Sequence, residues 1–259
     1  RITFTSDGTT FRHVDSFLDI PADAGDRVFV DVLPLHHTDG AIELLKRGVE
    51  VYYLRRTSLI AKKREELRLS SKSAKSDVKA LMAIGDKWFR RVSEDFLLMR
   101  RMIAGYRSLH KSHQQLLNKS KALSEYERDA LKPAIKAIEE QMEILAKQIA
   151  EEAGKRYPAY NEIIEELQIR EASAMETLAE IILYLDDRGF RRTANLFGLF
   201  KPARGGKKIY DGRLRQALQR LTASVNGVSA FQVTAKLEKR MLFEVWKAHR
   251  RLAIPAQQG

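Results

Sequence analysis

The chain has 259 residues, of which 46 are Lys or Arg and 34 are Asp or Glu, so its formal net charge is +12 at pH 7. It contains no cysteine, which excludes disulfides, a thiol nucleophile and a cysteine-based zinc site. The sequence contains no run of about 18 apolar residues, which a membrane span would need, and no signal-peptide pattern. We therefore expect a cytoplasmic protein with no membrane partner. The basic excess favours a polyanionic partner.

Residues 1–90 combine β-prone runs with short helical patterns. Asp7-Gly8 between two β-prone runs is typical of a hairpin. A strand, a short helix closed by Gly48 and a second strand follow within a few dozen residues, which indicates a βαβ unit with parallel strands. The expected elements are a hairpin at 2–14, strands at 27–33 and 49–54, a helix at 39–48, and mostly helix at 57–86.

Asp77 is the one acid in the lysine-rich stretch 72–81, where a helix is expected to begin. A first-turn aspartate complements the helix dipole, and Ser73 or Ser76 is a suitable N-cap, so a local explanation suffices. A role as a metal ligand is the alternative. The neighbouring pair His36-His37 is a second possible metal site, although such histidines are more often loop or core groups.

Residues 91–155 are expected to be almost entirely helical, with a polar turn within 118–132. Apolar residues step by three and four, which predicts a packing seam between two long helices rather than a cofactor site. The two helices form either an antiparallel hairpin or an intermolecular coiled coil that makes a homo-oligomer. The seam consists of Ile135, Ile138, Met142, Leu145 and Ile149.

Residues 156–259 are predicted to form short helices after a break at Pro158. Ten Lys or Arg and one acid, Asp211, lie between residues 188 and 220, and the glycine-containing loop 201–208 carries four of these cations. Free amides and cations together suit phosphate, so we predict nucleic-acid binding here. The candidate residues are Arg191, Arg192, Lys201, Arg204, Lys207, Lys208, Arg213 and Arg215.

Several sequence motifs, taken in chain order, resemble those of a known family. The N-terminal motifs are V-F-V-D-V-L-P-L-H-H-T-D-G-A-I-E-L-L-K-R-G-V-E-V (28–51) and K-S-A-K-S-D-V (72–78). The C-terminal motifs are L-A-E-I-I-L-Y-L-D (178–186), A-N-L-F-G-L-F-K-P (194–202) and G-G-K-K-I-Y-D-G-R-L-R-Q-A-L (205–218). Together they resemble the RuvC-like DEDD transposases of the IS-one-ten insertion-sequence family, in which a guide RNA directs recombination.

The resemblance implies an α/β plus α protein with three parts. These are a partial RuvC-like (RNase H-like) βαβ nuclease domain at 1–90, long coiled-coil helices at 91–155 and a helical transposase domain at 156–259. It also implies catalysis by acids that hold Mg²⁺, with DNA and structured RNA as partners. Asp31 and Asp77 match two of those acids and are the implied catalytic and metal-binding residues.

The chain also departs from the family pattern. Ala74 stands where the family has a third acid, and Ala203 to Gly206 stand where it has a Ser-Gly loop. Only 30 residues precede Asp31, so we expect the opening strand of the family domain to be missing. Three hypotheses follow: a transposase that cleaves and exchanges DNA strands, a non-catalytic nucleic-acid-binding regulator derived from one, or a coiled-coil scaffold.

Overall fold

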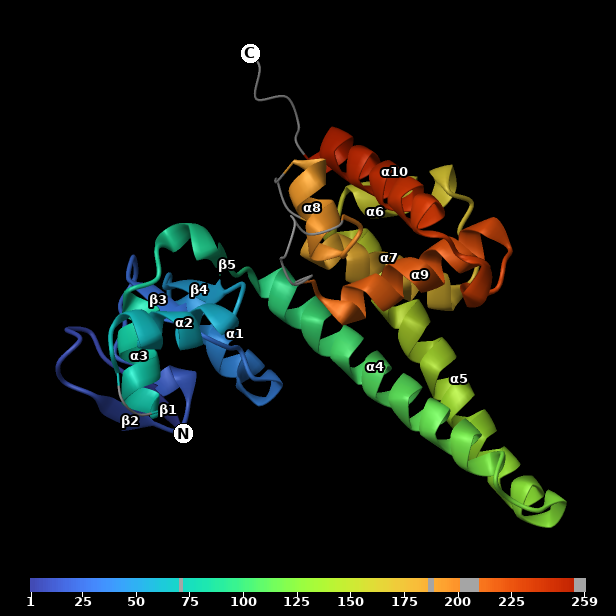
Figure 1. The fold of residues 1–259 in the computed structure, drawn as a ribbon, viewed down its shortest axis with the longest axis horizontal. Helices are drawn as coiled ribbons and strands as arrows, with labels where there is room; N and C mark the ends of the chain where they lie inside the picture. The colour runs from blue at the N-terminus through green and yellow to red at the C-terminus, as the bar shows by residue number, and fades with distance from the viewer. Residues whose placement is uncertain (70–71, 186–188, 201–209, 254–259) are drawn as a thin grey trace. The chain divides into compact units, whose positions relative to one another are not determined.

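The computed structural model is mostly helical, with two small β-sheets among the residues that it describes, and it divides into two compact units, residues 1–101 and 102–259 (Figure 1). The second unit therefore includes most of the long helices as well as the C-terminal short ones. None of the helices in the described residues is long and apolar enough to span a membrane. The structure describes residues 1–69, 72–185, 189–200 and 210–253.

The first unit opens with the predicted hairpin, which the structure confirms. Strand β1 (Ile2–Phe4) pairs antiparallel with β2 (Arg12–Val14). In the turn, the Asp7 carboxylate accepts backbone hydrogen bonds from Thr10 at 2.7 Å and Thr9 at 2.8 Å, which hold its pKa well below the usual range. Asp7 therefore has a local role in the turn.

A three-stranded sheet of order β3-β4-β5 forms the centre of the first unit. The two predicted strands, β3 and β4, are parallel, with Val28 opposite Val51, which confirms the βαβ unit. Gly48 has a φ of +83° just after the helix, a conformation that favours glycine. The elements are β3 (Arg27–Val30), α1 (Thr38–Lys46), β4 (Glu50–Leu54) and β5 (Phe89–Arg91), the last of these antiparallel to β4 and not predicted.

Two helices, α2 (Ser58–Glu66) and α3 (Ala74–Met82), follow β4 and precede β5 along the chain. They pack against each other. Of the two predicted caps, Ser73 is the N-cap of α3, and its side chain accepts a hydrogen bond from the backbone of Ser76 at 3.2 Å. The local core consists of Leu54, Ile60, Ala80, Leu81, Ile84 and Phe89. The 3₁₀ turns in the described part of the chain are Phe17–Asp19, Leu35–His37, Asp86–Trp88 and Ala230–Gln232.

The second unit contains the predicted pair of long helices, α4 (Glu94–Ser120, of which residues from Met102 belong to this unit) and α5 (Glu125–Arg156). His113 of α4 lies 2.8 Å from the Glu139 carboxylate of α5. Within the predicted seam Ile149 is fully buried, and its other four members are half-buried. Ile149 therefore belongs to the core of this unit, while the homo-oligomer through the other seam residues stays a prediction.

The remaining helices cover α5 and one another (Figure 1). The long helix α5 ends at Arg156, before Pro158, as predicted. Helix α7 is buried along nearly its whole length and packs against α5 and α9, while α10 packs against α6, α8 and α9. These helices are α6 (Ala159–Glu166), α7 (Ala172–Tyr184), α8 (Phe190–Leu196), α9 (Gly212–Asn226) and α10 (Ala235–Ala253).

Candidate nucleic-acid interface

Helix α10 has one apolar face and one basic, aromatic face. Met241, Leu242 and Val245 point into the core of the unit and are buried. On the opposite face, cations and aromatic rings recur at helical spacing, so they form one continuous stripe. The stripe consists of Lys236, Lys239, Arg240, Phe243, Trp246, Lys247 and Arg250.

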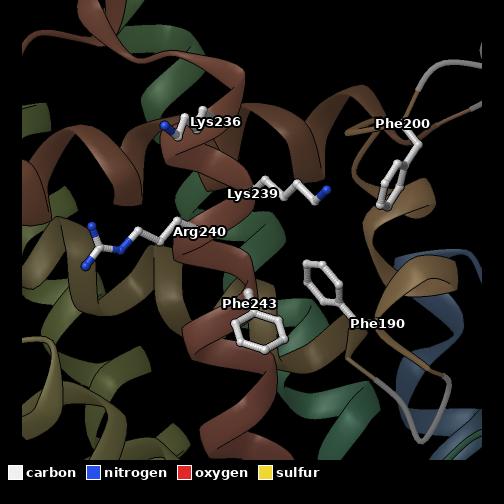
Figure 2. A pocket seen from close by; sticks show the side chains of 6 residues that line it. All are labelled: Phe190, Phe200, Lys236, Lys239, Arg240 and Phe243. Carbon is white, nitrogen blue, oxygen red and sulfur yellow. The ribbon is translucent and has the colours of Figure 1, made fainter.

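The N-terminal part of this stripe lines a hollow of about 390 Å³, which we call the aromatic–basic groove. Figure 2 shows Lys239 extending across the groove toward Phe200, and the rings of Phe190 and Phe243 lying close together on the same side. The groove is therefore built by α8, the turn after it, and α10. Its lining residues are Phe190, Phe200, Lys236, Lys239, Arg240 and Phe243.

The aromatic rings of the groove form an ordered cluster. Phe190 meets Phe243 edge-on, with ring centroids 5.1 Å apart and planes at 85°. Trp246 extends the cluster and stacks near Phe243 at 6.0 Å and 28°. Phe243 nevertheless remains 40% exposed. The groove thus presents an aromatic surface to solvent rather than a closed core.

The cations of the groove are available for an anionic ligand. The Lys239 ammonium lies 4.5 Å from the centroid of Phe200, a cation–π contact. Lys236 and Arg240 are exposed, and neither forms an ion pair with any residue that the structure describes. Three cations beside three rings can contact phosphates and nucleobases together.

Arg215 holds the elements of the groove in place. Its guanidinium donates hydrogen bonds to the carbonyl oxygens of Phe197 at 3.3 Å and Gly198 at 3.0 Å, at the end of α8. The same group pairs with Glu238, which is buried on α10. Arg215 was predicted to bind nucleic acid. In the structure its partly buried side chain links α9 to α8 and α10, and its described contacts are internal.

The other basic residues predicted from the sequence occupy different settings. Arg191 and Arg192 are exposed on α8, in the residues following Phe190. Arg213 is exposed at the start of α9, 3.8 Å from Asp211. The remaining candidates lie outside the described residues: Lys201, Arg204, Lys207 and Lys208.

The two predicted metal-binding acids each have a local partner. Asp31 follows β3, and its carboxylate accepts a hydrogen bond from the backbone of Val32 at 2.8 Å. Asp77 lies 3.2 Å from the Arg64 guanidinium, in an ion pair between α2 and α3 whose atoms are not aligned for a hydrogen bond. In the part of the chain that the structure describes, no three His, Asp or Glu residues form a group suited to a metal ion.

The histidine pair is also accounted for by packing. His37 meets the ring of Phe17 edge-on at 5.4 Å, and burial lowers the pKa of His37. The two imidazole centroids lie 4.1 Å apart. This arrangement agrees with the structural explanation of the pair.

A separate cluster of charges is buried inside the second unit. Glu176 and Glu180, one turn apart on α7, are fully buried. Arg107 of α4 donates two hydrogen bonds to Glu180, one of them at 3.1 Å, while Arg220 of α9 lies 3.6 Å from Glu180 and 3.8 Å from Glu176. Arg220, counted among the basic residues of 188–220, therefore forms ion pairs with two buried acids.

No model of a known protein family matches the chain, and no curated protein is significantly similar to it in sequence.

The aromatic–basic groove was not among the predicted sites, although its signal is present in the sequence. In K-L-E-K-R-M-L-F (236–243), Lys236, Arg240 and Phe243 follow one another at steps of four and three residues. That pattern indicates a basic amphipathic face. Phe190 and Phe200 carry no such signal, because only the packing of α8 against α10 brings them to it.

Proposed function

We propose that this chain is a nucleic-acid-binding protein of the transposase and recombinase class that binds DNA and structured RNA through the aromatic–basic groove. The observation that supports this is the joint exposure of Lys236, Lys239 and Arg240 around an aromatic hollow. The net charge of +12 favours the same partners, because cations that contact phosphates release counterions. The RuvC-like assignment rests on the sequence resemblance, and the parallel β3 and β4 are compatible with it.

Replacement of Lys236, Lys239 and Arg240 by Ala together tests the groove. We expect affinity for a labelled duplex or RNA hairpin to fall by roughly tenfold or more, and the log–log salt slope to shrink by about 2 to 3 units. The measurement is fluorescence anisotropy over a salt series at fixed pH.

A matched control removes the same number of positive charges elsewhere in the unit. Lys132, Lys136 and Lys147 are exposed on α5, and their triple alanine variant should bind within about twofold of wild type. Equal losses in the two variants would reject the groove as the site. No binding by the wild type at low salt would reject the function itself and leave the scaffold hypothesis.

By the same resemblance we propose metal-dependent strand cleavage, with Asp31 and Asp77 as the ligands of Mg²⁺. A non-catalytic regulator is the second candidate, and the Arg64–Asp77 ion pair favours it, because that carboxylate already has a cationic partner. The described residues also supply no group of three acids that could complete a metal site.

Cleavage assays with Mg²⁺ or Mn²⁺ separate the two candidates. A recombinase should cut a branched or duplex substrate, and Asp31→Asn and Asp77→Asn should each abolish cutting while circular dichroism stays unchanged. A regulator should bind the same substrate and leave it intact. Cutting that survives Asp77→Asn would exclude Asp77 as a ligand.

A further inference from the structure

We infer that the aromatic–basic groove is specific for unpaired nucleotides, with a base stacked on Phe243 and the neighbouring phosphates against Lys236, Lys239 and Arg240. The inference rests on the proposed function, and it adds the strand state of the ligand. DNA and RNA share this chemistry, since both present an unpaired base on a phosphate backbone.

The aromatic residues carry the argument for unpaired strands. A surface that contacts only phosphates needs cations and gains nothing from exposed rings. Here Phe243 keeps 40% of its surface in solvent, in the middle of a cationic face. The Phe190 ring meets the Phe243 ring edge-on, and the Trp246 ring lies near-parallel to it, so neighbouring rings hold Phe243 in place. A fixed and exposed ring is a stacking platform for a base.

The positions of the cations agree with a strand that runs along α10. Lys236 and Arg240 lie about one helical turn apart, and Phe243 lies about one turn further on. Figure 2 shows Arg240 directed away from the rings, while Lys239 extends toward Phe200. Charges therefore flank the aromatic hollow on more than one side. A duplex, whose bases are already stacked and paired, can use the charges but not the rings.

Trp246 supplies a direct reporter for this contact. The chain has two tryptophans, Trp88 and Trp246, so Trp88→Phe leaves Trp246 as the single emitter. In that background we expect an oligo-dT or oligo-U of about 12 nucleotides to quench the emission, and a duplex of matched length to leave it nearly unchanged.

Phe243→Ala should weaken binding of both single strands by roughly 5- to 100-fold, and binding of the duplex by less than about twofold. Phe243→Tyr, which keeps the ring, should bind as wild type. Phe231→Ala is the matched control, because that ring is fully exposed in the turn before α10 and outside the groove lining. All variants are compared by anisotropy with the full chain.

The outcomes separate this inference from the proposed function. Equal affinity for single strand and duplex, with no effect of Phe243→Ala, would overturn the inference and leave a phosphate-binding groove. A loss with Phe243→Ala that Phe243→Tyr does not restore would also overturn it, since the ring would then act through folding. No binding to any nucleic acid would reject the proposed function. An affinity for oligo-dT but not oligo-U would restrict the ligand to DNA.

Discussion

Glu176 illustrates how a single buried charge affects the second unit. Its carboxyl group is fully buried, and one oxygen has no hydrogen-bond partner among the described residues. Burial raises the pKa of Glu176 to about 7, and the guanidinium groups of Arg220 and Arg107 only partly oppose this. Glu180 takes the two hydrogen bonds of Arg107, so Glu176 is the less compensated acid.

The pKa of Glu176 makes stability depend on pH in a defined direction. The folded value of about 7 lies above the ordinary value of 4.5, so the folded state holds the extra proton between these limits. This group's contribution to the free energy of unfolding is therefore fully present below about pH 4.5 and is lost as pH rises through about 7.

Glu176→Gln should remove that dependence, because glutamine does not titrate. At pH 8 we expect the variant to be more stable than wild type by on the order of 1 to 3 kcal/mol, with little difference at pH 5. Urea unfolding at both pH values measures it. Variant and wild type are compared with each other at each pH, because a second group also makes stability depend on pH. Burial lowers the pKa of nearby His110, so its contribution to the free energy of unfolding rises with pH in both proteins.

Glu180→Gln is the matched control for the Glu176 test. It loses the carboxylate that accepts both hydrogen bonds from Arg107, so we expect it to be destabilised at pH 5 and at pH 8 alike. A Glu176→Gln variant with the pH profile of wild type would contradict the account of Glu176.

At the scale of elements, the turn after α8 determines how the groove is assembled. Gly198 has a φ of +69°, and the backbone N–H of Leu199 bonds to the carbonyl of Ala194 at 2.9 Å, a Schellman-type helix end. A Cβ at Gly198 would lie 2.7 Å from the Tyr210 ring. This turn therefore requires glycine both for its conformation and for space, and it leads directly to Phe200.

Three glycine-to-alanine variants of the second unit separate these two requirements. Gly212 has no positive φ and no neighbour within 4 Å of a Cβ, Gly227 has a φ of +61° and open space, and Gly198 has both the strain and the contact. We expect Gly212→Ala to be neutral or slightly stabilising, Gly227→Ala to cost about 1 kcal/mol, and Gly198→Ala to cost more.

Thermal unfolding of the three variants measures the order of their stabilities directly. Gly198→Ala should also weaken single-strand binding, because it displaces the turn that carries Phe200. Gly227→Ala should not affect binding. Equal stability of the Gly198 and Gly227 variants would mean that the Tyr210 contact relaxes without cost.

Elements with strong local signals agree with their sequence predictions, and one weak element does not. The hairpin, the βαβ unit and the Ser73 cap are confirmed because their turn residues, strand patterns and capping side chains act within a few residues. Strand β5 has only three residues, two of them arginines, and only pairing with β4 makes it a strand. Local propensity cannot reveal such an element.

At the scale of the whole molecule, each unit has its own core. Leu44 of α1 and Leu178 of α7 are both fully buried, one in each unit. Replacement of either by Ala should cost about 2 to 5 kcal/mol, because the side chain leaves a cavity. We expect two calorimetric transitions. Leu44→Ala should lower the midpoint temperature of one transition, and Leu178→Ala that of the other, each by roughly 10 °C or more.

The two variants serve as controls for each other. A single transition that moves equally in both would show that the units unfold together, in contrast to the two-core description.

The sequence alone determined the basic character of the chain, the order of most of its elements and the positions of its caps and turns. These depend on composition and on residues close together in the chain. The tertiary structure decided which charges remain available. In the sequence, Arg215 and Arg220 look like their basic neighbours. In the structure, Arg215 forms an ion pair with Glu238, and Arg220 forms ion pairs with Glu176 and Glu180, acids that lie far away along the chain. Packing of α8 on α10 likewise gathers Phe190, Phe200 and Phe243 into one groove, because side-chain contacts across helices depend on distances in space.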